Sequence, residues 1–112
     1  MGYIMNNTLI NVINEKREEI ESKMKEACRD ALDNKHMQFT VYVKESGKIG
    51  IMEDTANSNW TLADCYNGTA VEIATFCYAN EEIEEEYKEG IISEFDYDYE
   101  IDNTIRGLEE RE

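Results

Sequence analysis

The sequence predicts one α+β domain over residues 1–112, with a long N-terminal helix packed on a small antiparallel sheet of about three or four strands. Two observations predict this class. An apolar stripe with helical spacing runs through the first third of the chain, and β-branched and aromatic runs separated by turn residues follow it. We also expect an acidic helix in the C-terminal third. A chain of 112 residues is long enough for one hydrophobic core.

The N-terminal helix is expected from about residue 9 to residue 33. Its apolar residues recur at steps that place them on one side of a helix: Leu9, Ile13, Ile20, Met24, Ala27 and Ala31. The other sides carry Lys, Arg and Glu of mixed sign, which suits pairing between residues one turn apart. Asn6 or Asn7 can cap the start, and Asn34 is a suitable end.

A β-hairpin is expected next. Residues 38–44 are rich in β-branched and aromatic side chains, 45–48 supply a turn, and 49–52 form the returning strand. Residues 71–76 have a similar composition and predict a third strand. Together these runs favour a sheet against which the N-terminal helix packs.

An acidic helix is expected over residues 80–89. Asn80 can cap its start, and Glu residues near the positive end of the helix dipole favour it. Ile83 and Tyr87 would then face the core, and Gly90 would end the helix.

Residues 94–102 alternate strictly between acidic and aromatic or aliphatic side chains. In an extended segment the acidic side chains would form one row with a spacing of about 6.7 Å. One DNA strand carries a phosphate per roughly 3.4 Å of axis, so the row would have a coarser but comparable density of charge. The region also fits a last helix, because Ile101, Ile105 and Leu108 follow the spacing i, i+4, i+7. The pattern alone does not decide between strand and helix.

The net charge of −15 is unevenly placed. Residues 81–112 hold 14 acidic residues against three basic ones, a net charge of −11, and residues 1–80 hold the other −4. This balance argues against direct nucleic-acid binding and against binding to anionic membranes, since both need basic patches. We expect the partner to be a basic surface on a protein or nucleoprotein complex.

No residue pattern predicts catalysis, a cofactor or a metal site, so the chain is not expected to be an enzyme. Asp96-x-Asp98-x-Glu100 begins like a calcium-binding loop. However, Ile101 stands where that loop needs Gly, and Gly107 stands where it needs a bidentate Glu. An EF-hand is therefore excluded.

His36 is the only histidine, and Cys28, Cys65 and Cys77 lack the paired spacing of a zinc or redox motif. We expect a surface or capping role for His36 and reduced thiols for the cysteines. No apolar stretch is long enough to span a membrane, and the N-terminus lacks the pattern of a secretion signal. A cytoplasmic location is the expectation.

Three aromatic residues, Tyr42, Trp60 and Tyr66, are candidate anchors of a protein interface if they are exposed. Tyr42 lies on the side of its strand that is expected to be wetter. Stacking on nucleic-acid bases is a weaker interpretation, because stacking platforms lie beside basic grooves.

Small size, strong acidity, the lack of a catalytic pattern and an acidic segment backed by aromatic residues resemble the nucleic-acid-mimicking inhibitors of phages and mobile elements, among them anti-CRISPR and anti-restriction proteins. The resemblance lies in composition and layout, is concentrated in residues 81–112, and matches no family motif. It implies an inhibitor that occupies the basic nucleic-acid channel of a host nuclease complex, and it does not choose between Cas9-like effectors, other CRISPR complexes and restriction enzymes. We expect a CRISPR effector nuclease as the first candidate target, and a monomer or homodimer as the state of this protein. The residues expected to contact the partner are Glu84, Glu85, Glu89, Glu94, Asp96, Asp98, Glu100 and Asp102.

Two alternatives belong to other classes. One is a structural protein that self-associates through the helix at residues 9–33, while its acidic surface serves solubility. The other is a small enzyme, which would need a concave pocket that gathers His36, a cysteine and carboxylates.

Overall fold

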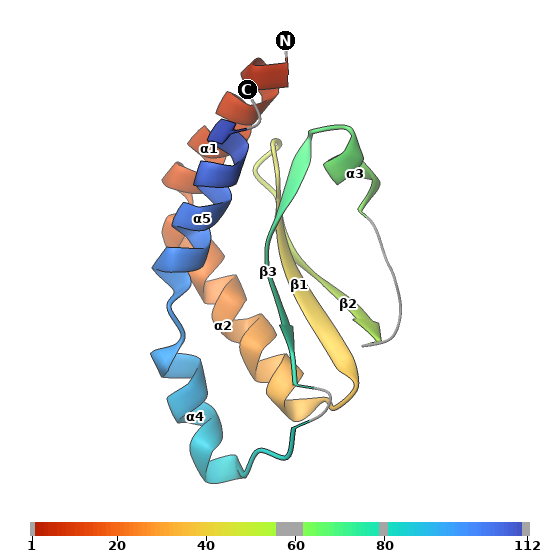
Figure 1. Ribbon diagram of the computed structural model, residues 1–112, viewed down its shortest axis with the longest axis vertical. Coiled ribbons are helices and arrows are strands. Elements are labelled where there is room, and N and C mark those ends of the chain that lie inside the picture. The colour runs from red at the N-terminus through yellow and green to blue at the C-terminus, as the bar shows by residue number, and fades with distance from the viewer. Residues whose placement is uncertain (1, 56–61, 79–80, 111–112) are drawn as a thin grey trace.

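The computed structural model describes residues 2–55, 62–78 and 81–110, which form an α+β fold (Figure 1). The strands are β1 (Met37–Lys44), β2 (Ile49–Thr55) and β3 (Ala70–Cys77), and the helices are α1 (Gly2–Glu15), α2 (Arg17–Asp33), α3 (Ala63–Tyr66), α4 (Glu85–Glu94) and α5 (Tyr97–Glu110). The three strands form one antiparallel sheet in the order β2-β1-β3. Helices α1, α2, α4 and α5 lie on one side of this sheet, and α3 lies near one end of β3 (Figure 1).

The prediction of one long N-terminal helix is wrong, because the helix breaks at Lys16 into α1 and α2. Lys16 has φ −117° and ψ 25°, and its N–H is shared between the carbonyls of Val12 and Ile13, at 3.0 and 3.3 Å. The two helices bury the stripe against different partners. The helix α1 packs on α5 and on part of β1, whereas α2 packs on all three strands of the sheet (Figure 1). The break lets the chain change direction between these two packing surfaces.

The predicted apolar stripe is buried along both helices. Its six residues are at most 1 % exposed: Leu9, Ile13, Ile20, Met24, Ala27 and Ala31. They belong to the same core as Phe39, Val41 and Val43 of β1. The start of the helix also differs from the prediction, since α1 begins at Gly2 and neither Asn6 nor Asn7 is its cap.

The central strand β1 pairs with both neighbours. Val41 lies opposite Ile51 of β2 and opposite Ala74 of β3. A bulge next to Val41 leaves Ile73 as an extra residue in β3. The β1–β2 turn contains Gly47, whose φ of +99° lies in the region that favours glycine.

The face of β1 that points away from α2 was predicted to be more exposed to water than the face toward α2. At its centre, however, this face is also buried. Thr40 is 1 % exposed, and its hydroxyl lies 2.8 Å from that of Thr75. Tyr42 is 8 % exposed, and its ring lies across Gly50 of β2, where a Cβ atom would come within 2.5 Å of the phenolic oxygen. A glycine thus gives an aromatic ring room to cover the neighbouring strand.

The extended interpretation of residues 94–102 is wrong, because this region belongs to two helices. The helix α4 ends at Glu94, and α5 begins at Tyr97 after a short link. The physical reason is burial of Ile101 and Leu108, which are at most 1 % exposed. Residues seven apart lie on one side of a helix but on opposite faces of a strand.

The acidic helix α4 is shifted along the chain from its predicted position. It begins at Glu85 and continues through Gly90, the predicted end. Ile83 packs partly buried against the core before the helix begins, whereas Tyr87 is 61 % exposed and does not face the core. The predicted cap, Asn80, lies outside the described residues.

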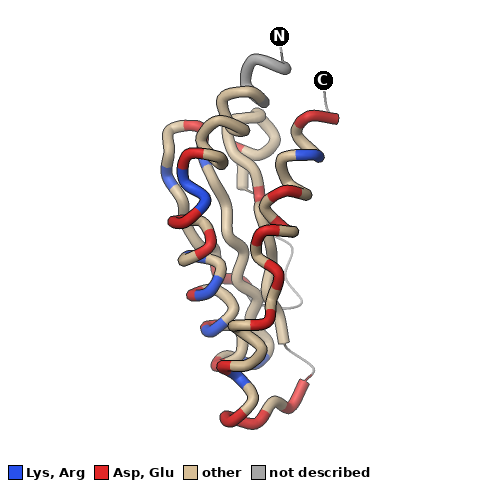
Figure 2. The backbone as a smooth tube through the Cα atoms, turned by 90° about the vertical axis from the view of Figure 1, so that its left-hand side faces the viewer, with Lys and Arg blue, Asp and Glu red and all other residues tan. Residues whose placement is uncertain are grey.

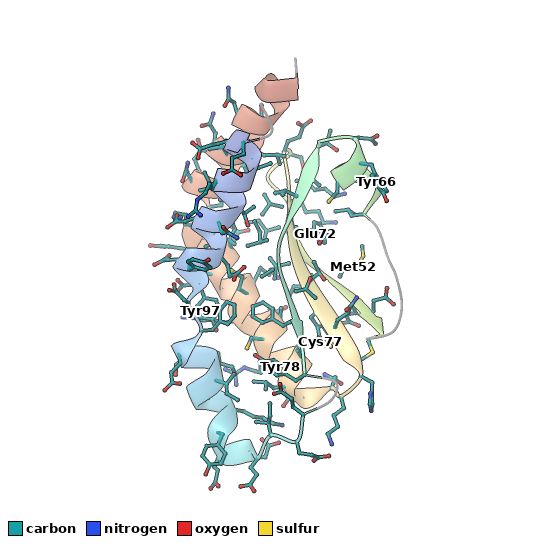
Figure 3. The ribbon with its side chains drawn as sticks, viewed as in Figure 1. Met52, Tyr66, Glu72, Cys77, Tyr78 and Tyr97 are labelled. Carbon is teal, nitrogen blue, oxygen red and sulfur yellow. The ribbon has the colours of Figure 1, made fainter. Side chains whose placement is uncertain are left out.

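Aromatic side chains hold the corner between α4 and α5. The Phe95 ring lies between those of Phe76 and Tyr97, with both pairs of centroids 4.9 Å apart. The Tyr97 hydroxyl, inside the molecule in Figure 3, donates a hydrogen bond to the carbonyl of Ile92. Burial raises the pKa of Tyr97 to about 12, so the phenol keeps the proton that it donates.

Truncation of a stripe residue tests this packing. We expect Ile20→Ala to lower the free energy of unfolding by about 2–5 kcal/mol, because it leaves a cavity in a fully buried site. The control is Ser22→Ala, an exposed position on the same helix, which should leave stability nearly unchanged. Equal urea midpoints for the two variants would contradict the packing of α2.

Two glycine substitutions should have opposite effects. Gly50→Ala should destabilise the fold by about 1–3 kcal/mol, because the new methyl group collides with the Tyr42 ring. Gly90→Ala should stabilise it by about 0.5–1 kcal/mol, because a Cβ there meets no atom within 4 Å and alanine favours a helix. Thermal unfolding followed by circular dichroism measures both. A stabilising Gly50→Ala would rule out the described position of Tyr42.

Candidate functional site

The eight predicted contact residues lie in α4, in α5 and in the segments next to them, but they do not form the predicted single row. Each residue of a helix is turned by about 100° from the previous one, so residues two apart point about 200° apart. Around α5, Asp98 and Asp102 therefore share one side, which lies toward α2. Glu100 lies on the other side with Thr104, whose hydroxyl is 3.5 Å from the Ile73 carbonyl oxygen of β3.

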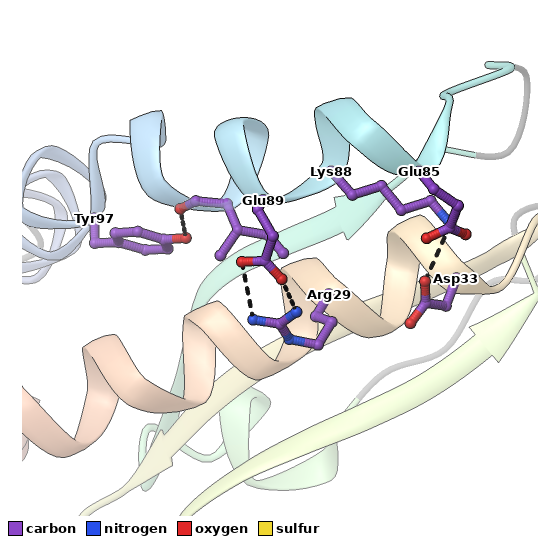
Figure 4. A network of polar contacts seen from close by, with 7 residues as sticks. Arg29, Asp33, Glu85, Lys88, Glu89 and Tyr97 are labelled. Atoms are coloured by element: carbon purple, nitrogen blue, oxygen red, sulfur yellow. Dashed lines mark hydrogen bonds and ion pairs between the residues drawn. The ribbon is translucent and has the colours of Figure 1, made fainter.

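Two of the predicted contact residues are ion-paired with α2. Glu89 binds Arg29, and Asp102 binds Arg17 (Figure 4 for the first pair). The hydrogen bond from Arg29 lowers the pKa of Glu89. These carboxylates attach α4 and α5 to α2, and their charges are partly neutralised inside the molecule.

A third predicted contact residue, Glu85, takes part in a bridge through Lys88. The Lys88 ammonium lies 2.7 Å from a Glu85 carboxylate oxygen and 3.1 Å from one of Asp33, in α2 (Figure 4). These two hydrogen bonds raise the pKa of Lys88. Lys88 thus joins a carboxylate of α4 to one of α2 and remains protonated near neutral pH.

The other five predicted contact residues make no ion pair within the described part of the chain: Glu84, Glu94, Asp96, Asp98 and Glu100. All are exposed except Glu100, which is half-buried. Asp96 has a local role, because one of its oxygens accepts the backbone N–H of Tyr99 at 3.0 Å at the start of α5. The charge of these five side chains is available to a partner.

The prediction missed three exposed acidic residues of the same two helices: Glu86, Glu109 and Glu110. Helical spacing is the signal that finds Glu109, which lies seven residues after Asp102 and therefore on the same side of α5. Figure 2 shows the result, since acidic residues dominate α4 and α5 while α2 carries both signs. We call the outward sides of α4 and α5, residues 84–110, the acidic surface.

Of the three predicted aromatic anchors, only Tyr66 is known to be exposed. Tyr66 in α3 is 82 % exposed and lies on the far side of the sheet from α5 (Figure 3). Tyr42 is buried, so that prediction is wrong. Trp60 lies outside the described residues.

The described residues contain no group of three or more His, Cys, Asp and Glu that could hold a metal ion. His36 is exposed in the turn after α2, with φ +68°. Cys28 is buried, and its sulfur lies 3.8 Å from the Tyr78 hydroxyl. Burial raises the pKa of the Cys28 thiol, which disfavours the reactive thiolate.

Among the helices of residues 2–55, 62–78 and 81–110, none has the length and apolar character needed to cross a membrane.

Comparison with protein-family models, with curated proteins and with solved structures finds no match to this chain.

The pH dependence of the Arg29–Glu89 pair can be predicted from the lowered pKa of Glu89. A lowered pKa in the folded state stabilises the protein above the ordinary pKa of Glu, about 4.3, and this contribution is lost as the pH falls through the lowered value. Glu89→Gln should therefore reduce the melting temperature at pH 7. It should leave the melting temperature unchanged near pH 2, because Glu89 is then protonated and as uncharged as the glutamine that replaces it.

The matched control is Glu86→Gln in the same helix, whose carboxylate makes no ion pair among the described residues. It should not lower the melting temperature at either pH. A Glu89→Gln variant as stable as wild type at pH 7 would contradict a role of the pair in attaching α4 to α2.

Proposed function

We propose that this protein inhibits a nucleic-acid-binding defence complex by placing its acidic surface in the basic channel that normally holds nucleic acid. The first candidate target is a CRISPR effector nuclease, and restriction enzymes are the second. One observation carries the proposal: two helices packed against α2 present carboxylates outward, and five of the predicted contact residues make no ion pair in the described structure.

The charge density of this surface supports the proposal. Residues 85–110 hold ten acidic residues and two basic ones. Along one side of α5, Asp98, Asp102 and Glu109 are four and seven residues apart, or about 6 and 10.5 Å along the helix axis, against one phosphate per about 3.4 Å along a DNA strand. Helices thus replace the predicted strand as the scaffold of the charges, at a coarser linear density.

The rigidity of the surface also supports it. The aromatic corner at Phe95 and the pairs of Glu89 and Asp102 with α2 hold α4 and α5 in place. A rigid acidic surface loses little conformational entropy when it binds. Lys and Arg side chains that line a nuclease channel would attract it over a distance, which speeds association.

The self-association alternative loses its predicted surface. The apolar stripe from Leu9 to Ala31 is buried in the core of its own chain, so it is not available to a second copy.

The enzyme alternative requires a pocket that gathers His36, a cysteine and carboxylates. A cavity of about 360 Å³ is lined by Cys65 and Glu72 together with Ala70 and Val71, and His36 is not among its lining residues.

A target in the cytoplasm of a host cell fits this function, because defence nucleases act on nucleic acid there. We propose the same location for this protein, and a monomer or dimer as its working form.

Neutralisation of the acidic surface tests the function. The variant Glu94→Gln/Asp98→Asn/Glu100→Gln removes three charges without an ion pair in the described structure. If each contact with a channel cation contributes about 0.2–1 kcal/mol, its affinity for the target should fall by roughly 3- to 160-fold. The matched control, Glu45→Gln/Glu53→Gln/Glu72→Gln, removes three charges from the sheet and its first turn, outside α4 and α5, and should bind like wild type.

Affinity is measured by fluorescence anisotropy against purified CRISPR effector and restriction nucleases, at about 50 and 200 mM salt. Wild-type affinity should fall steeply between these concentrations, and bound nucleic acid should exclude the protein. Full inhibition by a folded triple variant would contradict the proposed function, and so would simultaneous binding of nucleic acid and inhibitor.

A further inference from the structure

Two exposed tyrosines lie within the acidic surface. Tyr87 of α4 is 61 % exposed and Tyr99 of α5 is 56 % exposed, while most other large apolar side chains of the two helices pack inward. Tyr99 lies two residues from the buried Tyr97 and two from the buried Ile101, so it points about 200° away from the core. Exposed aromatic residues are frequent anchors of interfaces, because they bury a large area with few rotatable bonds.

The two rings have similar surroundings. Asp102, which is paired with Arg17, follows Tyr99 by three residues within α5, and residues three apart are neighbours on a helix surface. Asp96 lies just before α5, and one of its oxygens accepts the backbone N–H of Tyr99 at 3.0 Å. Glu84 is the N-cap residue of α4, three residues before Tyr87. Each exposed ring therefore has at least one carboxylate within about one turn of the chain.

A ring beside a carboxylate suits arginine better than lysine. A guanidinium is planar, so it can stack on the ring while its N–H groups bind the carboxylate, whereas an ammonium is a compact and strongly hydrated charge. The protein already holds one cation over a tyrosine, since the Lys25 ammonium lies 5.7 Å from the centroid of the Tyr97 ring. Within the described residues, no such contact involves Tyr87 or Tyr99.

We infer that Tyr87 and Tyr99 make the acidic surface selective for arginine, so that its partner is an arginine-rich protein surface. The inference rests on the proposed function and deepens it: the carboxylates supply attraction to any cation, and the two rings distinguish guanidinium from ammonium. A partner surface that holds nucleic acid mainly through lysines is bound less tightly than one of equal charge that uses arginines.

The test uses oligoarginine and oligolysine peptides of equal length as probes, with affinities measured by fluorescence anisotropy at one salt concentration. Wild type should bind oligoarginine more tightly. Tyr87→Leu/Tyr99→Leu should lower the oligoarginine affinity by about 5- to 30-fold, the loss expected for two exposed cation–π contacts. The oligolysine affinity should fall by a smaller factor. Tyr87→Phe/Tyr99→Phe keeps both rings and should keep the preference.

The control Tyr66→Leu removes an exposed tyrosine outside the acidic surface and should change neither affinity. Equal affinity of wild type for the two peptides, or an unchanged oligoarginine affinity in the double Leu variant, would overturn the inference. The neutralised variant Glu94→Gln/Asp98→Asn/Glu100→Gln should lower the affinities for oligoarginine and oligolysine by similar factors. If arginine selectivity is found but no nuclease is inhibited, the proposed function fails and the inference about arginine stands.

Discussion

The burial of one side of α5 fixes the rest of the acidic surface. Ile101 and Leu108 are at most 1 % exposed, and Tyr97 is 5 % exposed, so the rotation of α5 about its axis is set by the core. Once this rotation is fixed, Asp98 must point along one flank of the helix and Glu100 along the other. The Phe95 ring, packed between Phe76 and Tyr97, then sets the angle at which α4 leaves α5. A change in this apolar packing would rearrange every carboxylate outside it.

The charge of the protein is distributed so that the fold tolerates it. A net charge of −15 on 112 residues favours expansion through self-repulsion. The cations of α2 oppose this, because Arg17 and Arg29 bind carboxylates of α5 and α4. Each such exposed pair contributes little by itself. Together they hold two acidic helices beside α2 and leave the remaining carboxylates outward.

The sequence predicted well whatever depends on local pattern, and poorly whatever depends on contacts distant in the chain. The stripe from Leu9 to Ala31 and the strands that follow it are clear from spacing and residue type. The break at Lys16 has no local signal, since neither Pro nor Gly is near it, and it separates a helix packed mainly on α5 from a helix packed on the sheet. Residues 94–102 satisfy a strand period and a helix period at once, and burial of Leu108 decides for the helix. Glu89 and Asp102 were predicted as partner contacts, but both are ion-paired within the chain. These pairs could not be predicted from the sequence, because Arg29 and Arg17 lie 60 and 85 residues away from them.

The most direct test of the central claim is a hydrogen–deuterium exchange footprint of this protein, free and bound to a CRISPR effector nuclease. If the acidic surface enters the nucleic-acid channel, protection on binding should concentrate in peptides covering residues 84–110, and it should disappear when the channel is first filled with nucleic acid. Protection centred on α3 and the far side of the sheet, with residues 84–110 unchanged, would contradict the account.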